Sequence, residues 1–317
     1  ISALSKSHTR NLEQQEFEKQ VVSIEDTIER ATGAMIYKDE VQARTLYTSA
    51  EALIDSLVVN TPEKEQVTTK LKEEIEVAMN ELRHIRIIPN PAFLGDLAGF
   101  GDGVVGSAMV KSGSDILVLG SNNKAYKLDK SKKLFNSISQ DSAVPGKIKT
   151  ASQEDGLVYT LTEDQKIFSL NQEEKIFKDT NISTDKTWVD FVAYANRLYV
   201  LQPPQNDSKG QIIKFNKAGS GFNAGSEWIT SRTTSLTNAS SLSIDGTLYV
   251  LKKNGQIVRF ASGAEMGWSN GVVDPAMTKA TKIWTNTESD FVYVLEPLTK
   301  RVVVYNKENG AFVVQYK

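Results

Sequence analysis

A β-rich segment recurs five times in this chain, and this repeat constrains the possible folds more than any other sequence feature. Each copy is a short apolar run ending in leucine, and the runs are 115–119, 156–161, 197–201, 246–251 and 290–295. Their terminal leucines are 42, 40, 50 and 44 residues apart. Because a four-stranded propeller blade takes about 40 to 50 residues, the spacing predicts a β-propeller.

A second β-rich run follows each of these segments after a polar turn. These second runs are 125–128, 167–170, 212–215, 257–260 and 302–305. The first runs are almost wholly apolar, as expected for strands enclosed between neighbouring blades, and the second runs admit Lys or Arg. With strands before and after, for example 147–152 and 175–178, the pattern predicts a mainly β fold with about five four-stranded blades over 95–317. No blade shared between the two chain ends is expected, and a further blade outside this sequence is left open.

One repeat carries a resemblance to a known family. Residues 245–250 read Asp-Gly-Thr-Leu-Tyr-Val, and residues 255–260 read Gly-Gln-Ile-Val-Arg-Phe. This resembles the NHL-type propeller repeat, in which Gly-x-Ile/Leu-Tyr-Val is followed by Arg-Ile/Val-x-x-Phe. The chain departs from that pattern at Leu251 and Lys252, where the family has a small residue and then Asp. The resemblance therefore implies an NHL-like architecture over about 220 residues, and it carries over no activity.

The first third of the chain has the periodicity of helices. Apolar residues spaced four and three apart predict three amphipathic helices: Phe17, Val21, Ile24, Ile28 and Ala31; then Ala43, Leu46, Tyr47, Ala50, Leu53, Ile54 and Leu57; then Val67, Leu71, Ile75, Ala78, Leu82 and Ile85. Thr61 is the expected N-cap of the third helix, with Pro62 at its first position. We expect two to three helices over 1–88, as a bundle or coiled-coil stalk that could mediate oligomerisation, then a Pro-rich linker over 89–94.

Charge and hydropathy limit the classes of partner. The first 94 residues hold 11 Lys and Arg against 16 Asp and Glu, and the remainder holds 26 against 23, which gives the net charge of −2. Such small values disfavour nucleic-acid binding. No apolar run is long enough for a membrane segment. Because the chain starts at Ile1, we expect a processed product or soluble fragment. The compartment is not predicted, and an extracytoplasmic location is left open if an upstream signal or membrane segment is missing.

The residue inventory restricts catalysis. The chain has no Cys, and its two His residues, His8 and His84, lie in the helical part. A histidine-ligated metal or a Ser-His-Asp set inside the propeller is thereby excluded. Acidic residues recur near the turns that open the hairpins, where we interpret them as turn residues, and four tryptophans are interpreted as core packing. These residues are Asp102, Asp115, Asp155, Asp245 and Asp290, with Trp188, Trp228, Trp268 and Trp284. The sequence predicts no catalytic residue, no metal ligand and no cofactor.

The 50-residue spacing contains an extra loop at 203–210. Insertions of this kind lie on a propeller face and often carry contacts, although a tolerated surface loop is the alternative. We predict a partner-contact loop formed by Pro203, Pro204, Gln205, Asn206, Asp207 and Lys209.

The favoured function is a non-enzymatic binding or scaffold module that presents a propeller face to a protein or peptide. The alternative is a propeller that binds a small ligand or carbohydrate, or a carboxylate-based hydrolase or lyase. In either case the chain could be the extracytoplasmic part of a membrane-anchored sensor.

Overall fold

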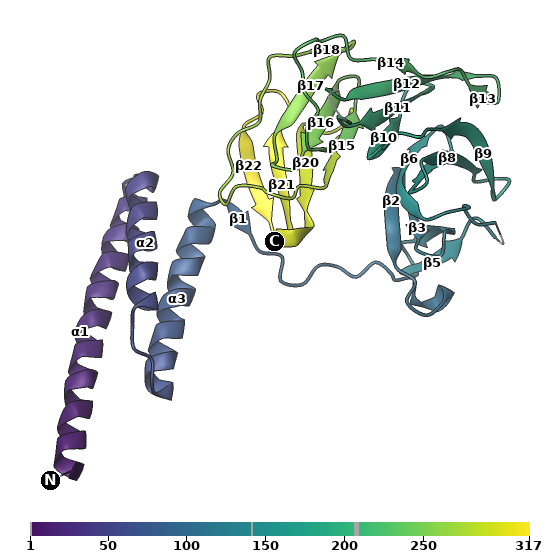
Figure 1. Cartoon of the computed structure of the whole chain (residues 1–317). Coiled ribbons are helices and arrows are strands. Elements are labelled where there is room, and N and C mark those ends of the chain that lie inside the picture. The colour runs from purple at the N-terminus through teal and green to yellow at the C-terminus, as the bar shows by residue number, and fades with distance from the viewer. Residues whose placement is uncertain (1, 141, 206–208) are drawn as a thin grey trace. The chain divides into compact units, whose positions relative to one another are not determined.

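The computed structural model describes residues 2–140, 142–205 and 209–317. It divides the chain into two compact units, one that ends at Ile87 and one that covers Ile88–Lys317. The first unit is helical and the second is built from strands (Figure 1). The predicted architecture, a five-bladed propeller with helices ahead of it, is confirmed.

Three helices form the first unit. They are α1 (Ser2–Ile36), α2 (Glu40–Asp55) and α3 (Pro62–Leu82), and the two-residue strand β1 (Ile85–Arg86) follows them. The Asp39 carboxylate accepts a hydrogen bond from the backbone N–H of Gln42 and caps α2. The Thr61 hydroxyl accepts from the N–H of Lys64 at 3.3 Å, so the predicted cap of α3 is confirmed. None of the described helices is both long and apolar enough to span a membrane.

The helices share one core, and the predicted face of α3 is buried at Leu71, Ile75 and Leu82 but differs at the start of the helix. Phe17, Ile24 and Ile28 of α1 are buried, as predicted. In α3 the predicted Val67 is 37% exposed, whereas Lys64 and Thr68 are buried beside it. The Lys64 ammonium lies 4.9 Å from the centroid of the Phe17 ring, which gives this buried cation an aromatic partner. The polar residues at the start of α3 therefore take core positions that a hydrophobicity pattern assigns to Val67.

Five four-stranded antiparallel sheets form the blades of the second unit. The strands in chain order are β2 (Gly106–Ser112), β3 (Asp115–Gly120), β4 (Ala125–Asp129) and β5 (Leu134–Ser137) in blade 1; β6 (Ile148–Glu154), β7 (Leu157–Thr162), β8 (Lys166–Asn171) and β9 (Ile176–Ser183) in blade 2; β10 (Asp190–Ala193), β11 (Arg197–Gln202), β12 (Gln211–Ala218) and β13 (Gly221–Phe222) in blade 3; β15 (Ala239–Ile244), β16 (Leu248–Lys252), β17 (Ile257–Ala261) and β18 (Ala264–Glu265) in blade 4; and β19 (Lys282–Trp284), β20 (Phe291–Glu296), β21 (Arg301–Asn306) and β22 (Phe312–Tyr316) in blade 5. A further short strand, β14 (Ser226–Glu227), pairs with β12.

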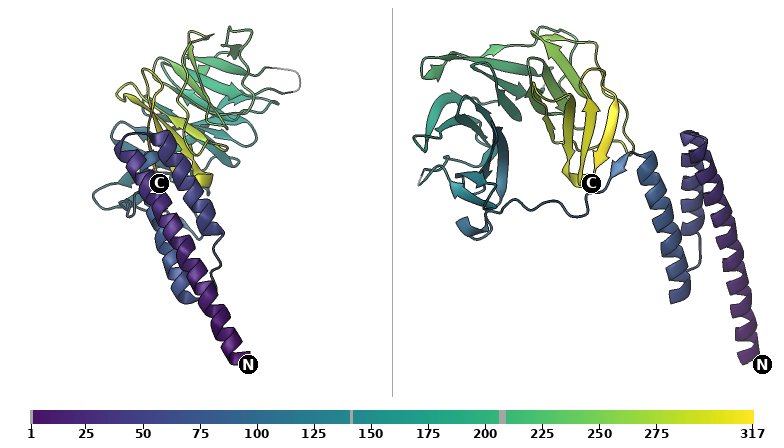
Figure 2. Two further views of the ribbon diagram at one scale, coloured as in Figure 1. Left: turned by 90° about the vertical axis from the view of Figure 1, so that its left-hand side faces the viewer. Right: turned by 180° about the vertical axis from the view of Figure 1, so that it is seen from behind.

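Each blade runs from the centre of the propeller to its rim in chain order. Figure 2 shows the blades following one another from teal through green to yellow. The second strand of each blade is the repeated apolar run. In blade 4, for example, all four residues of 248–251 are fully buried, and β16 pairs with β17 so that Leu248 faces Phe260. Neighbouring blades cover both faces of such a strand, which explains its unbroken apolar sequence.

The tryptophans divide between core and surface. Trp188 is 2% exposed, Trp228 packs against the apolar cluster between blades 3 and 4, and Trp268 packs against the cluster between blades 4 and 5. Trp284 in β19 differs, because it is 42% exposed and its ring lies 5.6 Å from that of Tyr293. The core interpretation is therefore correct for three tryptophans and wrong for Trp284. Its strand is the innermost of its blade, and the central channel leaves one side of the ring uncovered.

Candidate functional site

The predicted contact loop joins β11 to β12, and part of it lines a pocket. Pro203, Pro204 and Gln205 form one wall of a cavity of about 730 Å³. Lys209 is placed elsewhere, because its ammonium donates to the backbone carbonyl of Arg232 and its own carbonyl accepts from the N–H of Leu236. Asn206 and Asp207 lie outside the described residues. The structure thus brings three of the six predicted residues together at one cavity.

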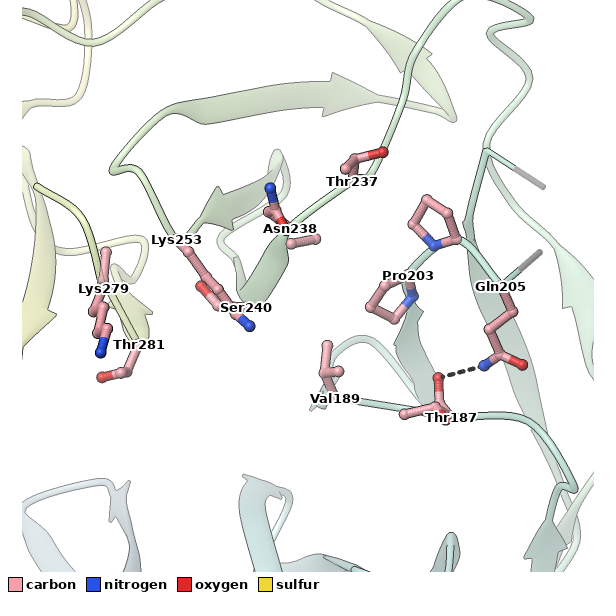
Figure 3. A pocket seen from close by; sticks show the side chains of 13 residues that line it. Thr187, Val189, Pro203, Gln205, Thr237, Asn238, Ser240, Lys253, Lys279 and Thr281 are labelled. Atoms are coloured by element: carbon pink, nitrogen blue, oxygen red, sulfur yellow. Dashed lines mark hydrogen bonds between the residues drawn. The ribbon is translucent and has the colours of Figure 1, made fainter. Parts of the chain in front are cut away.

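The pocket opens at one end of blades 3, 4 and 5, and we call it the blade 3–5 pocket. The described residues that line it come from the connections between blades, from the turns between second and third strands, and from the start of β15. They are Thr187, Val189, Pro203, Pro204, Gln205, Thr237, Asn238, Ala239, Ser240, Lys253, Lys279, Ala280 and Thr281. Figure 3 shows Lys253 and Lys279 on one side of the site and Pro203 and Gln205 on the other. The site thus combines hydroxyl and amide groups, apolar surface and two cations.

Backbone hydrogen bonds hold the lysine side of the pocket. The N–H of Ala280 donates to the carbonyl of Lys253 at 2.8 Å, and the N–H of Lys253 donates to the carbonyl of Asn238 at 2.9 Å. The turn that carries Lys253 depends on Gly255, which has a φ of +83° and a position where a Cβ would lie 2.5 Å from Met277 Cε. Blades 4 and 5 are therefore joined directly beneath the two lysines.

A buried carboxylate fixes the segment that bears Lys279. Glu296 is fully buried, and its Oε1 accepts from the N–H groups of Thr278 at 2.7 Å and Lys279 at 3.0 Å. Its Oε2 accepts from the Thr299 hydroxyl at 2.7 Å and from the Arg301 guanidinium at 2.7 Å. Burial alone raises the pKa of Glu296, but these hydrogen bonds outweigh it and lower the pKa from 4.5 to about 2. The carboxylate is therefore charged at neutral pH and holds the pocket wall in place.

The opposite wall is held through Trp188. Its N–H donates to the side-chain carbonyl of Gln165 at 2.8 Å, and its own carbonyl accepts from the ammonium of Lys149 at 2.6 Å. Burial lowers the pKa of Lys149, and the nearby charges of Glu163 and Asp190 oppose that effect. On the same wall the Gln205 side-chain amide donates to the carbonyl of Thr187 at 3.3 Å (Figure 3). The contact loop is thus tied to the connection that leads into blade 3.

Lys253 and Lys279 supply the charge of this pocket. Both side chains are exposed, and no acidic residue is among the described residues that line the cavity. Neither lysine forms an ion pair within the part of the chain that the structure describes. Two uncompensated cations in a concave surface create a positive potential that favours anionic groups.

The central channel is a second cavity, of about 280 Å³, lined by the innermost strands of all five blades. Asp190 of β10 lies at this centre and is 2% exposed. Its Oδ1 accepts from the Thr150 hydroxyl at 3.0 Å and from the Lys282 ammonium at 2.7 Å. Its Oδ2 accepts from the Ser241 hydroxyl at 2.5 Å and from the N–H of Leu242 at 3.0 Å. One carboxylate therefore joins blades 2, 3, 4 and 5.

This arrangement bears on the hydrolase or lyase alternative. A catalytic carboxylate needs a free oxygen that faces substrate or water, whereas both oxygens of Asp190 already accept from protein donors. Within residues 2–140, 142–205 and 209–317, no group of three or more His, Asp or Glu side chains is arranged to hold a metal ion. The hydrogen bonds to Asp190 therefore link blades 2 to 5 and have a structural role.

Two of the five acidic residues predicted at turns, Asp245 and Asp115, have side-chain partners among the described residues. Asp245 Oδ1 accepts from the N–H of Thr247 at 3.1 Å, and its Oδ2 accepts from the Lys307 ammonium of blade 5 at 2.8 Å. Asp115 pairs with Lys127 across blade 1 at 2.6 Å. These contacts agree with the structural interpretation of Asp245 and Asp115.

Sequence reasoning found the proline loop but missed Lys253, Lys279, Asp190 and Glu296. Lys253 stands in a Lys-Lys-Asn-Gly turn that reads as an ordinary exposed hairpin. Glu296 directly follows the apolar run of its repeat, at the position that Lys252 takes in the preceding repeat, and this departure from the NHL-type pattern was a usable signal. Asp190 is followed by Phe191 and Val192, and a single acidic residue beside an apolar strand does not indicate which residues it contacts. Its partners are 40, 51 and 92 residues away.

Comparison with known protein families and with curated proteins gives no sequence match. Among solved structures, the chain is similar to YCF48 from Cyanidioschyzon merolae, with 10% identity, a TM-score of 0.45, and coverage of 71% of this chain and 73% of that one. It also resembles a structural genomics protein of unknown function from Bacteroides thetaiotaomicron, at 12% identity and a TM-score of 0.46, over 61% and 57% of the two chains. A computationally designed protein, Ika8, gives 9% identity and a TM-score of 0.42 over 67% and 61%.

The chain spans less than two thirds of the length of the Bacteroides and Ika8 structures. At these identities the likeness concerns fold alone, and membership of the NHL family is not shown.

Proposed function

We propose that this chain is a non-enzymatic binding protein whose blade 3–5 pocket takes an extended segment of a protein partner. The observation that carries the proposal is the pocket itself, which the predicted contact loop lines with Pro203, Pro204 and Gln205. Its volume of about 730 Å³ lies within the range of about 300 to 1,000 Å³ found for ligand sites. A hollow of this size accommodates a few side chains of an extended peptide.

The walls of the pocket favour binding over chemistry. Consecutive prolines stiffen the loop, so less conformational entropy is lost when a partner orders against it. The side-chain amide of Asn238 offers a donor and an acceptor that an extended backbone can use. Val189 and the proline rings supply apolar surface. None of the described lining residues is a histidine or a carboxylate.

The proposal is tested by selection of random twelve-residue peptides, displayed on phage, against the immobilised full chain. Enriched peptides are synthesised, and their dissociation constants are measured by fluorescence anisotropy. We expect the triple variant Pro203→Gly/Pro204→Gly/Gln205→Gly to weaken binding about tenfold or more, since it removes both the apolar wall and its rigidity.

The matched control is Lys130→Gly/Ser131→Gly/Lys132→Gly, three substitutions in the exposed turn between β4 and β5 of blade 1. This control is expected to bind as the unchanged chain does. Equal binding by the loop variant and the unchanged chain would show that the peptide binds outside the blade 3–5 pocket. No enrichment of any peptide would refute the proposed function.

Binding of a small ligand or carbohydrate is the competing function, because the same hydroxyl and amide groups suit sugars. An array of neutral and acidic oligosaccharides, probed with the labelled full chain, separates the two functions. Oligosaccharide binding that the loop variant abolishes, together with no peptide enrichment, would favour this alternative. The sensor interpretation stays a prediction from the sequence.

A further inference from the structure

The two cations of the blade 3–5 pocket are built into rigid backbone. Lys253 has both its N–H and its carbonyl engaged, with Asn238 and with Ala280. The N–H of Lys279 is held by the fully buried carboxylate of Glu296 at 3.0 Å. The main chain at both lysines is therefore fixed while their ammonium groups stay in solvent. Such preorganised charge lowers the cost of binding an anion.

Nearby carboxylates do not neutralise this pair. Glu296 forms a buried ion pair with Arg301 at 2.7 Å, and its acceptor positions are occupied. Asp190, next to the lining residue Val189, is paired with Lys282 at 2.7 Å. The nearby carboxylates are thus paired with Arg301 and Lys282, and the described part of the pocket carries two unpaired positive charges.

The other residues that line the pocket indicate which kind of anion fits. Pro203 and Val189 offer apolar surface across the site from the lysines (Figure 3). An occupant that matches both sides has carboxylates toward blades 4 and 5 and an apolar side chain toward blade 3. An extended peptide combines these groups at neighbouring positions, because alternate side chains point in opposite directions.

We infer that the blade 3–5 pocket binds an acidic peptide segment, with Asp or Glu carboxylates accepting from Lys253 and Lys279 and an adjacent apolar side chain against Pro203 and Val189. This inference rests on the proposed function and adds the chemical class of the partner. The interaction is electrostatic and exposed, so its affinity falls as the salt concentration rises.

The test starts from the peptides enriched on the full chain, whose acidic content is compared with that of the unselected library. The tightest acidic peptide is then measured against an isosteric version in which Asp is replaced by Asn and Glu by Gln. Both peptides are titrated with the unchanged chain, with Lys253→Gln/Lys279→Gln, and with the control Lys132→Gln/Lys133→Gln in blade 1. The control removes the same charge at exposed positions outside the pocket.

We expect acidic residues to be enriched and the isosteric peptide to bind roughly tenfold more weakly than its parent. The pocket variant should lose the same factor for the acidic peptide and lose almost nothing more for the isosteric one. The control should match the unchanged chain. A double-variant cycle of this kind isolates the contacts between carboxylate and ammonium from general changes.

Two results overturn the inference and leave the proposed function intact. One is enrichment of neutral or basic peptides that depend on Pro203 and Pro204, and the other is equal binding of the acidic and isosteric peptides. A hyaluronan hexasaccharide that displaces the peptide and binds more tightly would also overturn it, since the anion would then be a sugar acid. If no peptide is enriched at all, the proposed function fails with it.

Discussion

In the channel, the Lys282 ammonium donates to both oxygens of Asp190, at 2.7 and 2.9 Å. In the blade 3–5 pocket, Lys253 and Lys279 have no carboxylate partner among the residues that the structure describes. Blades 3, 4 and 5 contribute residues to both places. The difference lies in burial, because Asp190 is 2% exposed and would be costly without a cation, whereas the pocket lysines are solvated. The charges in the channel thus hold the blades together, whereas the charges in the pocket are free to contact a partner.

Removal of the channel carboxylate is the strongest way to test this separation. Asp190→Ala leaves the donors of Thr150, Ser241 and Leu242 without an acceptor and leaves Lys282 without its counter-ion. We expect the free energy of unfolding of the propeller to fall by about 4 kcal/mol, measured by urea denaturation. A loss below about 1 kcal/mol would show that the channel charge is as dispensable as that of the pocket.

The buried Glu296 predicts a pH dependence. Its pKa is about 2 in the folded chain and 4.5 as the ordinary value, so its contribution is present above about pH 4.5 and is lost as the pH falls toward 2. The difference corresponds to about 3 kcal/mol. Urea denaturation between pH 6 and pH 2.5 should show this loss in the unchanged chain and a smaller loss in Glu296→Gln. Parallel curves for the two proteins would contradict the assigned pKa.

A smaller effect is expected at Lys282, the other half of the channel pair. Lys282→Met keeps the aliphatic stem but leaves the Asp190 carboxylate without a cation. Because the Lys282 side chain is 41% exposed, solvent screens part of the interaction, and we expect a loss of about 2 kcal/mol. Differential scanning calorimetry at pH 7 checks this value. A loss as large as that of Asp190→Ala would mean that the ion pair outweighs the other hydrogen bonds.

The pocket lysines should give the smallest change in stability. For Lys253→Gln/Lys279→Gln we expect the free energy of unfolding to change by less than about 0.5 kcal/mol, because both side chains are exposed and unpaired. The same urea measurement is used. A clear loss of stability would identify these lysines as structural and remove the contrast with Lys282.

The repeat predicted the fold well because it records burial that is local to each strand. Residues 248–251 are apolar on both faces, and the structure buries both faces. The same reasoning failed at Val67 and Trp284, where the neighbouring element leaves a large side chain uncovered. A hydrophobicity pattern describes one element and does not contain the shape of the surface packed against it.

The candidate site was predictable in part. An insertion with two consecutive prolines indicated the loop that lines the pocket. Lys253 and Lys279 belong to one site only because the fold brings blades 4 and 5 together, and the sequence does not show this proximity. Asp190 acts through partners that the ring assembles, whereas the partners of Glu296 lie 3 to 18 residues away, in blade 5 and in the connection that leads into it. Sequence spacing alone does not show which distant donors a carboxylate will meet, and this is why the role of Asp190 was missed.

The hydrogen bonds to Asp190 also affect the order in which the blades can become stable. Repeat proteins that contact nearest neighbours alone can gain stability one unit at a time. Here a carboxylate from the third blade accepts from residues 40 positions before it and 51 and 92 positions after it. During synthesis its shell of donors stays incomplete until Lys282 has left the ribosome. The last blade therefore completes the centre of the earlier ones, and blades 2 to 5 are expected to unfold as one cooperative unit.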